Sequence, residues 1–181
     1  MKKFYIFDMD GTLCDSMSYW REESASVKDF RDREEVEPVF ERKRKHNEND
    51  IELKSGVLDD LKAARRRGIK MCIASATRYD VSEPFLKRSG LMEYMEFYID
   101  CFSVHAFKQR PDVYLRAAER LGAEIGDCAV FEDAEYCAET AKRAGFYVVG
   151  IYDEVADREG EPQKFCDIFV SSWSELFDID F

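Results

Sequence analysis

Short apolar runs alternate with helix-length amphipathic segments along most of the 181-residue chain. The first run, residues 4–7, is too short to be anything but a buried strand, and it ends abruptly on Asp8, Asp10 and Gly11. From Gly56 onward, we predict helices over 57–67, 81–89, 111–121 and 134–144, and strands over 69–74, 97–99, 128–131, 146–151 and, weakly, 168–170. This alternation predicts an α/β fold, a parallel sheet joined by right-handed crossovers with helices on both faces.

Residues 14–55 follow a different pattern, in which charged side chains dominate from Arg21 to Glu52. They leave only a thin apolar stripe of helical type, made by Trp20, Val27, Phe30, Val36, Val39 and Phe40. We expect Pro38 to begin a second helix in this segment. The chain is therefore predicted to have an α/β core, residues 1–13 and 56–181, and a small helical cap, residues 14–55, inserted over the site.

Composition narrows the possible partners. Apolar residues make up 45% of the chain and charged residues 36%, which fits one globular core with a small insertion. The formal net charge of -11 opposes wholesale contact with nucleic acid or anionic lipid, so an anionic substrate needs local help from a metal ion or a lysine. No apolar run approaches a signal-peptide core or a membrane span, and we expect a cytoplasmic protein.

Six cysteines are scattered along the chain without the paired spacing of a zinc site or a redox motif. They are interpreted as reduced and mostly buried thiols. Cys14 lies near the acidic pair, but no histidine stands beside it in sequence, so the pattern does not favour it as a nucleophile.

Further polar clusters are expected where the other strands end, at the sheet edge that binds ligands in open α/β folds. They are Ser75 to Thr77, Lys108 in the loop before Pro111, and Glu132 with Asp133. If these ends meet at one rim, Asp8, Asp10 and Asp133 can hold Mg²⁺ while Ser75 and Lys108 bind a phosphoryl group. Two plainer readings stay open: Thr77 could replace Ser75, and Glu132 with Asp133 could cap the next helix.

Four groups of residues, Asp8-Met9-Asp10-Gly11-Thr12, Ser75, Lys108 with Pro111-Asp112, and Glu132-Asp133, resemble the four motifs of the haloacid dehalogenase (HAD) superfamily in order and spacing. The resemblance implies a Rossmann-like, HAD-type fold. An insertion between the first two motifs resembles the helical cap of the phosphoglycolate phosphatase and β-phosphoglucomutase branch. This sequence departs from that branch in one respect: its cap is short and heavily charged, and the apolar stripe is thinner than a self-contained helical bundle needs.

The resemblance also implies a mechanism. Asp8 attacks phosphorus to form an aspartyl-phosphate, and Asp10 protonates the leaving oxygen and then activates the hydrolytic water. The phosphoryl group is expected to be bound by Ser75, backbone groups near Ala76, and Lys108. The expected Mg²⁺ ligands are Asp8, the Asp10 carbonyl, Asp133 and, through water, Glu132.

The function implied is that of a Mg²⁺-dependent phosphatase of a small phosphorylated metabolite, a monomer or homodimer without nucleic-acid or membrane partners. A phosphomutase of the β-phosphoglucomutase kind would use the same Asp8 chemistry and stays open. A non-enzymatic phospho-acceptor signalling module fits less well, because receivers have no cap and no second aspartate at the Asp10 position. The basic run 42–46 could either meet a second anionic group of the substrate or form a solvated helix face.

Overall fold

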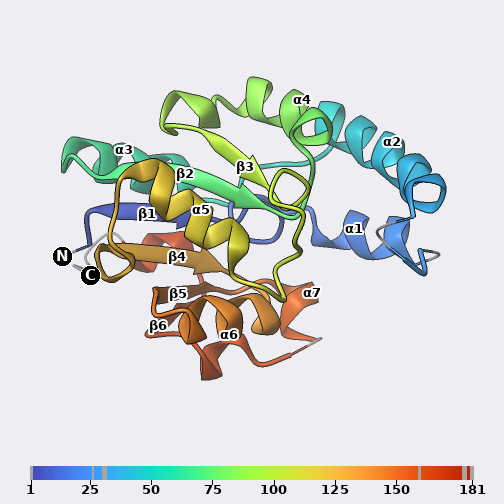
Figure 1. The fold of residues 1–181 in the computed structure, drawn as a ribbon. Helices are drawn as coiled ribbons and strands as arrows, with labels where there is room; N and C mark the ends of the chain where they lie inside the picture. Colours follow the sequence, from blue (N-terminus) through green and yellow to red (C-terminus); the bar gives the residue numbers. More distant parts are fainter. Residues whose placement is uncertain (1, 26, 30–31, 159, 177–178, 180–181) are drawn as a thin grey trace.

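A parallel sheet forms the centre of the molecule (Figure 1). The computed structural model describes residues 2–25, 27–29, 32–158, 160–176 and 179. Within them the strand order is β3-β2-β1-β4-β5-β6, and every neighbouring pair is parallel. The strands are β1 (Phe4–Phe7), β2 (Lys70–Ser75), β3 (Tyr98–Asp100), β4 (Cys128–Glu132), β5 (Tyr147–Ile151) and β6 (Ile168–Val170). The predicted parallel α/β fold, including the weak last strand, is confirmed.

The helices connect the strands and cover both faces of the sheet. They are α1 (Met17–Ser24), α2 (Arg33–Asn49), α3 (Val57–Arg66), α4 (Tyr79–Ser89), α5 (Asp112–Leu121), α6 (Glu135–Arg143) and the short α7 (Glu154–Asp157). In the described part of the chain, 3₁₀ turns accompany them at Leu91–Glu93, Ile125–Asp127, Pro162–Lys164 and Trp173–Glu175. The helices predicted from Gly56 onward have ends within two residues of those observed, which is the usual uncertainty of a helix boundary.

Alternation along the strands explains the two apolar layers, because successive side chains of a strand point to opposite faces. Tyr5 and Phe7 pack with α3 and α4 on one face, whereas Ile6 packs with α5 and α6 on the other. On the first face the Phe7 and Phe131 rings lie 4.5 Å apart, and Trp173 stacks on Phe131 at 5.9 Å. These contacts fix β1 beside β4, so the segments that follow both strands lie at one edge.

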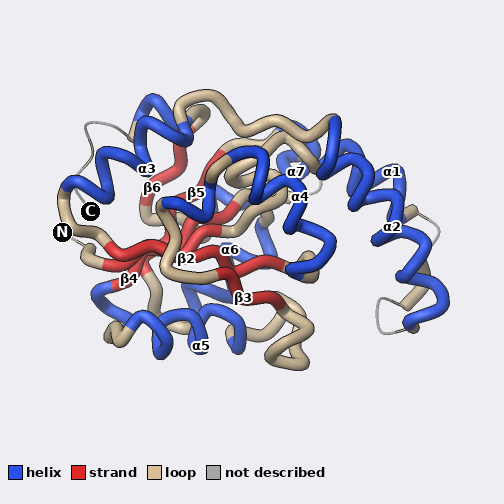
Figure 2. The backbone as a smooth tube through the Cα atoms, turned by 90° about the horizontal axis from the view of Figure 1, so that it is seen from above, coloured by secondary structure: helices blue, strands red, loops and turns tan. Residues whose placement is uncertain are grey.

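Helices α1 and α2 lie together, beyond the carboxyl ends of the strands (Figures 1 and 2). In the apolar stripe, Val36 and Phe40 of α2 pack on Val81 of α4, with Trp20, Val27 and Phe102 against them, whereas Phe30 lies outside the described residues. The assignment of residues 14–55 to a separate cap stays a prediction. None of the helices in the described part of the chain has the length and apolar character needed to cross a bilayer.

The expectation that Pro38 begins a helix is wrong. Helix α2 begins at Arg33, where the Asp32 side chain accepts a hydrogen bond from the Glu34 backbone N–H at 2.9 Å. This capping bond starts the helix before the proline is reached. Pro38 lies in the second turn at an exposed position, and its missing N–H leaves only the Glu34 carbonyl without its usual helical donor.

Candidate active site

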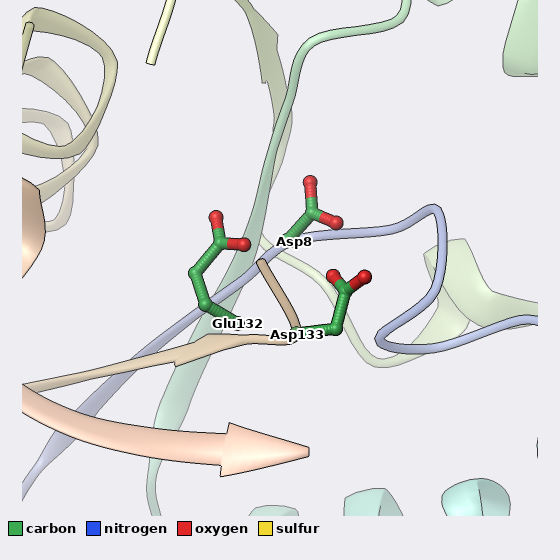
Figure 3. A group of neighbouring side chains, drawn as sticks. All are labelled: Asp8, Glu132 and Asp133. Carbon is green, nitrogen blue, oxygen red and sulfur yellow. The ribbon is translucent and has the colours of Figure 1, made fainter. Parts of the chain in front are cut away.

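Three carboxylates meet where β1 and β4 end (Figure 3). Asp8 follows β1, and its backbone N–H donates to the Phe131 carbonyl at 2.9 Å. Glu132 is the last residue of β4 and Asp133 follows it. One oxygen from each of the three carboxylates lies within 4.8 Å of the others, and all three residues are buried. The parallel pairing of β1 with β4 therefore places them side by side, as expected from the sequence.

Lys108 balances part of this negative charge. Its ammonium group donates to Asp8 Oδ1 and, at 2.6 Å, to Glu132 Oε1, and its side chain is only 2% exposed. The Tyr114 hydroxyl of α5 also donates to Glu132 Oε1, at 2.6 Å. Three carboxylates and one ammonium leave two negative charges in excess when all are ionised, which matches one divalent cation.

The same residues fit a metal ion by a second observation. Asp133 Oδ1 accepts from the Thr12 hydroxyl at 3.0 Å, while Asp133 Oδ2 is buried and has no hydrogen-bond partner among the described residues. Burial raises the pKa of Asp8 to about 7 against the opposing effect of Lys108, and it also raises the pKa of Asp133, with a further contribution from Asp8. A cation bound by these oxygens removes both costs, and oxygen ligands of this kind suit Mg²⁺.

The carboxylate of Asp10 lies apart from that cluster and has its own donors. Lys43 Nζ and Ser16 Oγ donate to Asp10 Oδ1 at 2.7 and 2.6 Å, and Thr77 Oγ1 donates to Oδ2 at 2.6 Å. Burial favours the protonated form, but the Lys43 charge and these hydrogen bonds outweigh it and hold the pKa of Asp10 below its ordinary value. The two aspartates of the first motif therefore have different surroundings, Asp8 in the acidic cluster and Asp10 among donors.

The second motif lies beside Asp10. Ser75 is fully buried and its hydroxyl oxygen accepts from the Thr77 backbone N–H at 3.0 Å. Ala76 lines the pocket described below. Because the Thr77 hydroxyl is bonded to Asp10, it is not available in this arrangement to replace Ser75. Phosphoryl binding by Ser75 and Ala76 stays a prediction.

The plainer reading of Glu132 and Asp133 as a helix cap does not hold. Ala134 is the N-cap residue of α6, and its side chain makes no capping hydrogen bond. The two carboxylates are instead directed toward Lys108, Tyr114 and Thr12.

A cavity of about 560 Å³ opens from these residues between the core and helices α1 and α2. Asp8, Asp10, Lys108, Glu132 and Asp133 all line it. Aromatic side chains from both parts form much of the remaining wall: Trp20, Phe40, Phe102, Phe107 and Tyr136. A cavity of this size accommodates a small organic phosphate.

Some side chains of the basic run 42–46 lie at the surface, whereas Lys43 is buried. Arg44 pairs with Glu48 at 3.7 Å and His46 with Asp50 at 2.7 Å, as expected for a solvated face, and Arg42 pairs with Glu23. Lys43 is fully buried on Asp10. None of these five residues lines the cavity at the acidic cluster, so neither reading of the run describes it completely.

Four residues that touch the predicted site were not predicted to do so: Ser16, Lys43, Thr77 as a partner of Asp10, and Tyr114. A signal for Lys43 exists in the sequence. The buried positions 36, 40, 43 and 47 of α2 are spaced by four, three and four residues, so the helical period of the apolar stripe continues through Lys43 to Asn47. Nothing comparable marks Tyr114, whose hydroxyl is directed by the packing of α5.

Comparison with known proteins agrees with this geometry. A family model described as haloacid dehalogenase-like hydrolase matches residues 19–145. The chain belongs to this family. The matched range begins after Asp8 and Asp10, so the family is shown by the part of the chain that contains Ser75, Lys108, Glu132 and Asp133.

Several relatives are similar over parts or most of their length. The Bacillus subtilis protein YhcW is 28% identical over 188 residues, 86% of each chain. The β-phosphoglucomutase of B. subtilis is 30% identical over 112 residues, 62% of this chain and 46% of its own. Fructose-1-phosphate phosphatase YqaB of Escherichia coli is 30% identical over 81 residues, 45% of this chain and 43% of its own. The chain thus spans less than half the length of the last two.

The fold is also that of a solved structure of the protein CbbY from Rhodobacter sphaeroides, crystallised with phosphate. The two superpose with a TM-score of 0.80 at 23% sequence identity, over 97% of this chain and 96% of the other. The HAD-type fold expected from the four motifs is confirmed, and the protein is a hydrolase of this family by its membership.

Proposed function

We propose that the protein is a Mg²⁺-dependent phosphatase that hydrolyses a small phosphorylated metabolite through an aspartyl-phosphate on Asp8. The observation that carries this proposal is the buried cluster of Asp8, Glu132 and Asp133 around Lys108, with its excess negative charge and the unpartnered oxygen of Asp133. A family relative named as a phosphatase of fructose 1-phosphate supports a phosphorylated carbohydrate or a metabolite of similar size as the substrate.

In the first step an oxygen of Asp8 forms a bond to phosphorus and the bond from phosphorus to the ester oxygen breaks. The negative charge of a bound phosphate ester opposes the effect of Lys43 and favours the protonated form of Asp10, which gives its proton to that leaving oxygen. In the second step water attacks the phosphorus of the aspartyl-phosphate, its proton passes to Asp10, and inorganic phosphate leaves with Asp8 restored. Lys108 contacts Asp8 directly, so its ammonium can neutralise charge on the nucleophile and on the transferred group.

The metal ion would be held by Asp8 and Asp133, with the Asp10 carbonyl as a further ligand and Glu132 acting through water. Bound Mg²⁺ would supply positive charge to the phosphoryl oxygens. Lys108 and Tyr114 hold Glu132 Oε1, which fixes that carboxylate beside the other two. Ser75 and the backbone near Ala76 complete the proposed phosphoryl site.

The test is release of inorganic phosphate from a panel of phosphate esters, including sugar phosphates, with Mg²⁺ and with excess chelator. We expect Mg²⁺-dependent turnover of at least one member, and a loss of about 10³-fold or more in Asp8→Asn, whose amide has the shape of the carboxylate without its nucleophilic charge. A wild type that releases no phosphate from any ester, or an Asp8→Asn variant of equal activity, refutes the proposal. Sugar phosphate that is converted without phosphate release points to a phosphomutase instead.

A further inference from the structure

Helix α2 carries a positive charge into the interior. Lys43 is fully buried, and its ammonium lies 2.7 Å from Asp10 Oδ1. Its Nζ also lies 4.7 Å from the centre of the Trp20 ring of α1. Lys43 and Asp10 are 33 residues apart in the chain. Their ion pair therefore joins helix α2 to the segment that follows β1.

The donors around Asp10 leave one position open on its carboxylate. A carboxylate oxygen accepts about two hydrogen bonds. Ser16 and Lys43 both bond to Oδ1, whereas Thr77 alone among the described residues bonds to Oδ2. The orientation of the carboxylate is therefore fixed from three separate segments, and the side chain that keeps this unfilled acceptor position lines the cavity.

The burial of the Lys43 charge is not needed to attach α2 to the core. Asn47 Nδ2 donates to the Val81 carbonyl of α4 at 2.8 Å, and Arg88 donates to the Asn47 carbonyl at 2.9 Å. Arg78 at the start of α4 adds a two-bond pair with Glu37, at 2.9 and 3.1 Å. A buried ion pair is a weak source of stability compared with apolar side chains of similar volume. These contacts and the apolar stripe already hold the helix, so the buried charge calls for a role at Asp10.

We propose that Lys43 is a positioning residue, which makes the orientation of the Asp10 carboxylate depend on helix α2. The inference rests on the proposed function, in which Asp10 gives a proton to the leaving oxygen. Efficient proton transfer from Asp10 therefore depends on the contact between Lys43 and Asp10. Lys43 itself does not line the cavity.

The test compares two esters, because they depend on proton transfer to different degrees. The leaving group of 4-nitrophenyl phosphate departs readily without a proton, whereas an alkyl phosphate needs one. The kcat/KM of each is measured for wild type, Lys43→Met, Lys43→Arg and, as a control on the same helix, Lys45→Met, whose side chain is exposed. We expect Lys43→Met to lose at least tenfold more on the alkyl ester than on the aryl ester, Lys43→Arg to lose less, and Lys45→Met to match wild type.

A double-mutant cycle separates this role from a structural one. In an Asp10→Asn background, adding Lys43→Met should change the alkyl-ester kcat/KM less than twofold, because Lys43 acts through Asp10. If Lys43→Met does not fold, the ratio of the two esters in Lys43→Arg decides, since the guanidinium keeps the charge but moves the donor atoms. An active wild type in which the Lys43 variants lose equally on both esters, or lose nothing, overturns the role of Lys43 alone. An inactive wild type overturns the proposed function and this role with it.

Discussion

Gly11 lies between the acidic cluster and α1, and alanine at this position should disable the metal site. Its φ is +85°, a conformation in which an L side chain costs about 1–2 kcal/mol. A Cβ here would lie 2.7 Å from both Asp133 Cγ and Met17 Cγ, and closer still to Asp133 Oδ2. Real Cβ atoms essentially never approach so closely, so the Asp133 carboxylate or the turn must move.

Gly122 provides the matched control. Its φ is +69°, and a Cβ there would meet no atom within 4 Å. Gly122→Ala should therefore lose only the conformational contribution, about 1–2 kcal/mol of unfolding free energy, with unchanged activity. Gly11→Ala should lose that and, in addition, at least about 10-fold in Mg²⁺ affinity, which is the lower end of the loss seen when groups that orient metal ligands are removed.

The assays are urea unfolding for stability, isothermal titration of the folded protein with Mg²⁺, and Mg²⁺-dependent phosphate release. Comparing the two alanine variants cancels the shared φ contribution and leaves the displacement of Asp133. If Gly11→Ala binds Mg²⁺ and turns over substrate within twofold of Gly122→Ala, then the close approach of Gly11 to Asp133 does not matter for the site.

Three more predictions test the surroundings of the site. Trp173→Phe keeps an aromatic ring but removes the indole N–H that donates to the buried Thr12 carbonyl at 3.0 Å, so urea unfolding should show a loss of about 1–3 kcal/mol. Burial and Asp59 raise the pKa of Asp60 to about 6, so between about pH 4 and 6 the native state keeps a proton that the unfolded chain has released. The stability that this group contributes therefore falls as pH rises from 4 to 6. Asp60→Asn should flatten the dependence of Tm on pH over this range. Burial raises the pKa of the Cys14 thiol, and peptide mass spectrometry should find it alkylated by iodoacetamide in urea but not in the native protein.

The sheet could be predicted from sequence because its strands are short apolar runs with clear ends. Residues 4–7 and 128–131 each stop at carboxylates, and in a parallel sheet such stops must lie at one edge. This rule places Asp8, Glu132 and Asp133 at one edge of the sheet, and the pairing of β1 with β4 brings them together. Pairing β1 between β2 and β4 then explains why segments more than 100 residues apart converge there.

The contacts of Asp10 could not be predicted by the same rule, because they depend on the phase of a helix and not on the end of a strand. The run 42–46 is charged at nearly every position, and composition alone makes it a solvated face. The signal that was available is the spacing of the buried positions 36, 40, 43 and 47, which places Lys43 one helical turn beyond Val39 and Phe40 on the same stripe.

The position of Lys43 on the buried stripe of α2 distinguishes it from the neighbouring charged residues, although all of them are charged. On a helix with a thin apolar stripe, a polar residue at a stripe position must be buried with a partner or pull the helix away from the core. Asn47 finds Val81, and Lys43 finds Asp10. One partner is a backbone carbonyl of a packing helix, but the other is the carboxylate proposed to carry the proton. A helix that needed only to pack could have placed an apolar residue at 43, so the choice of lysine is best explained by what it does to Asp10.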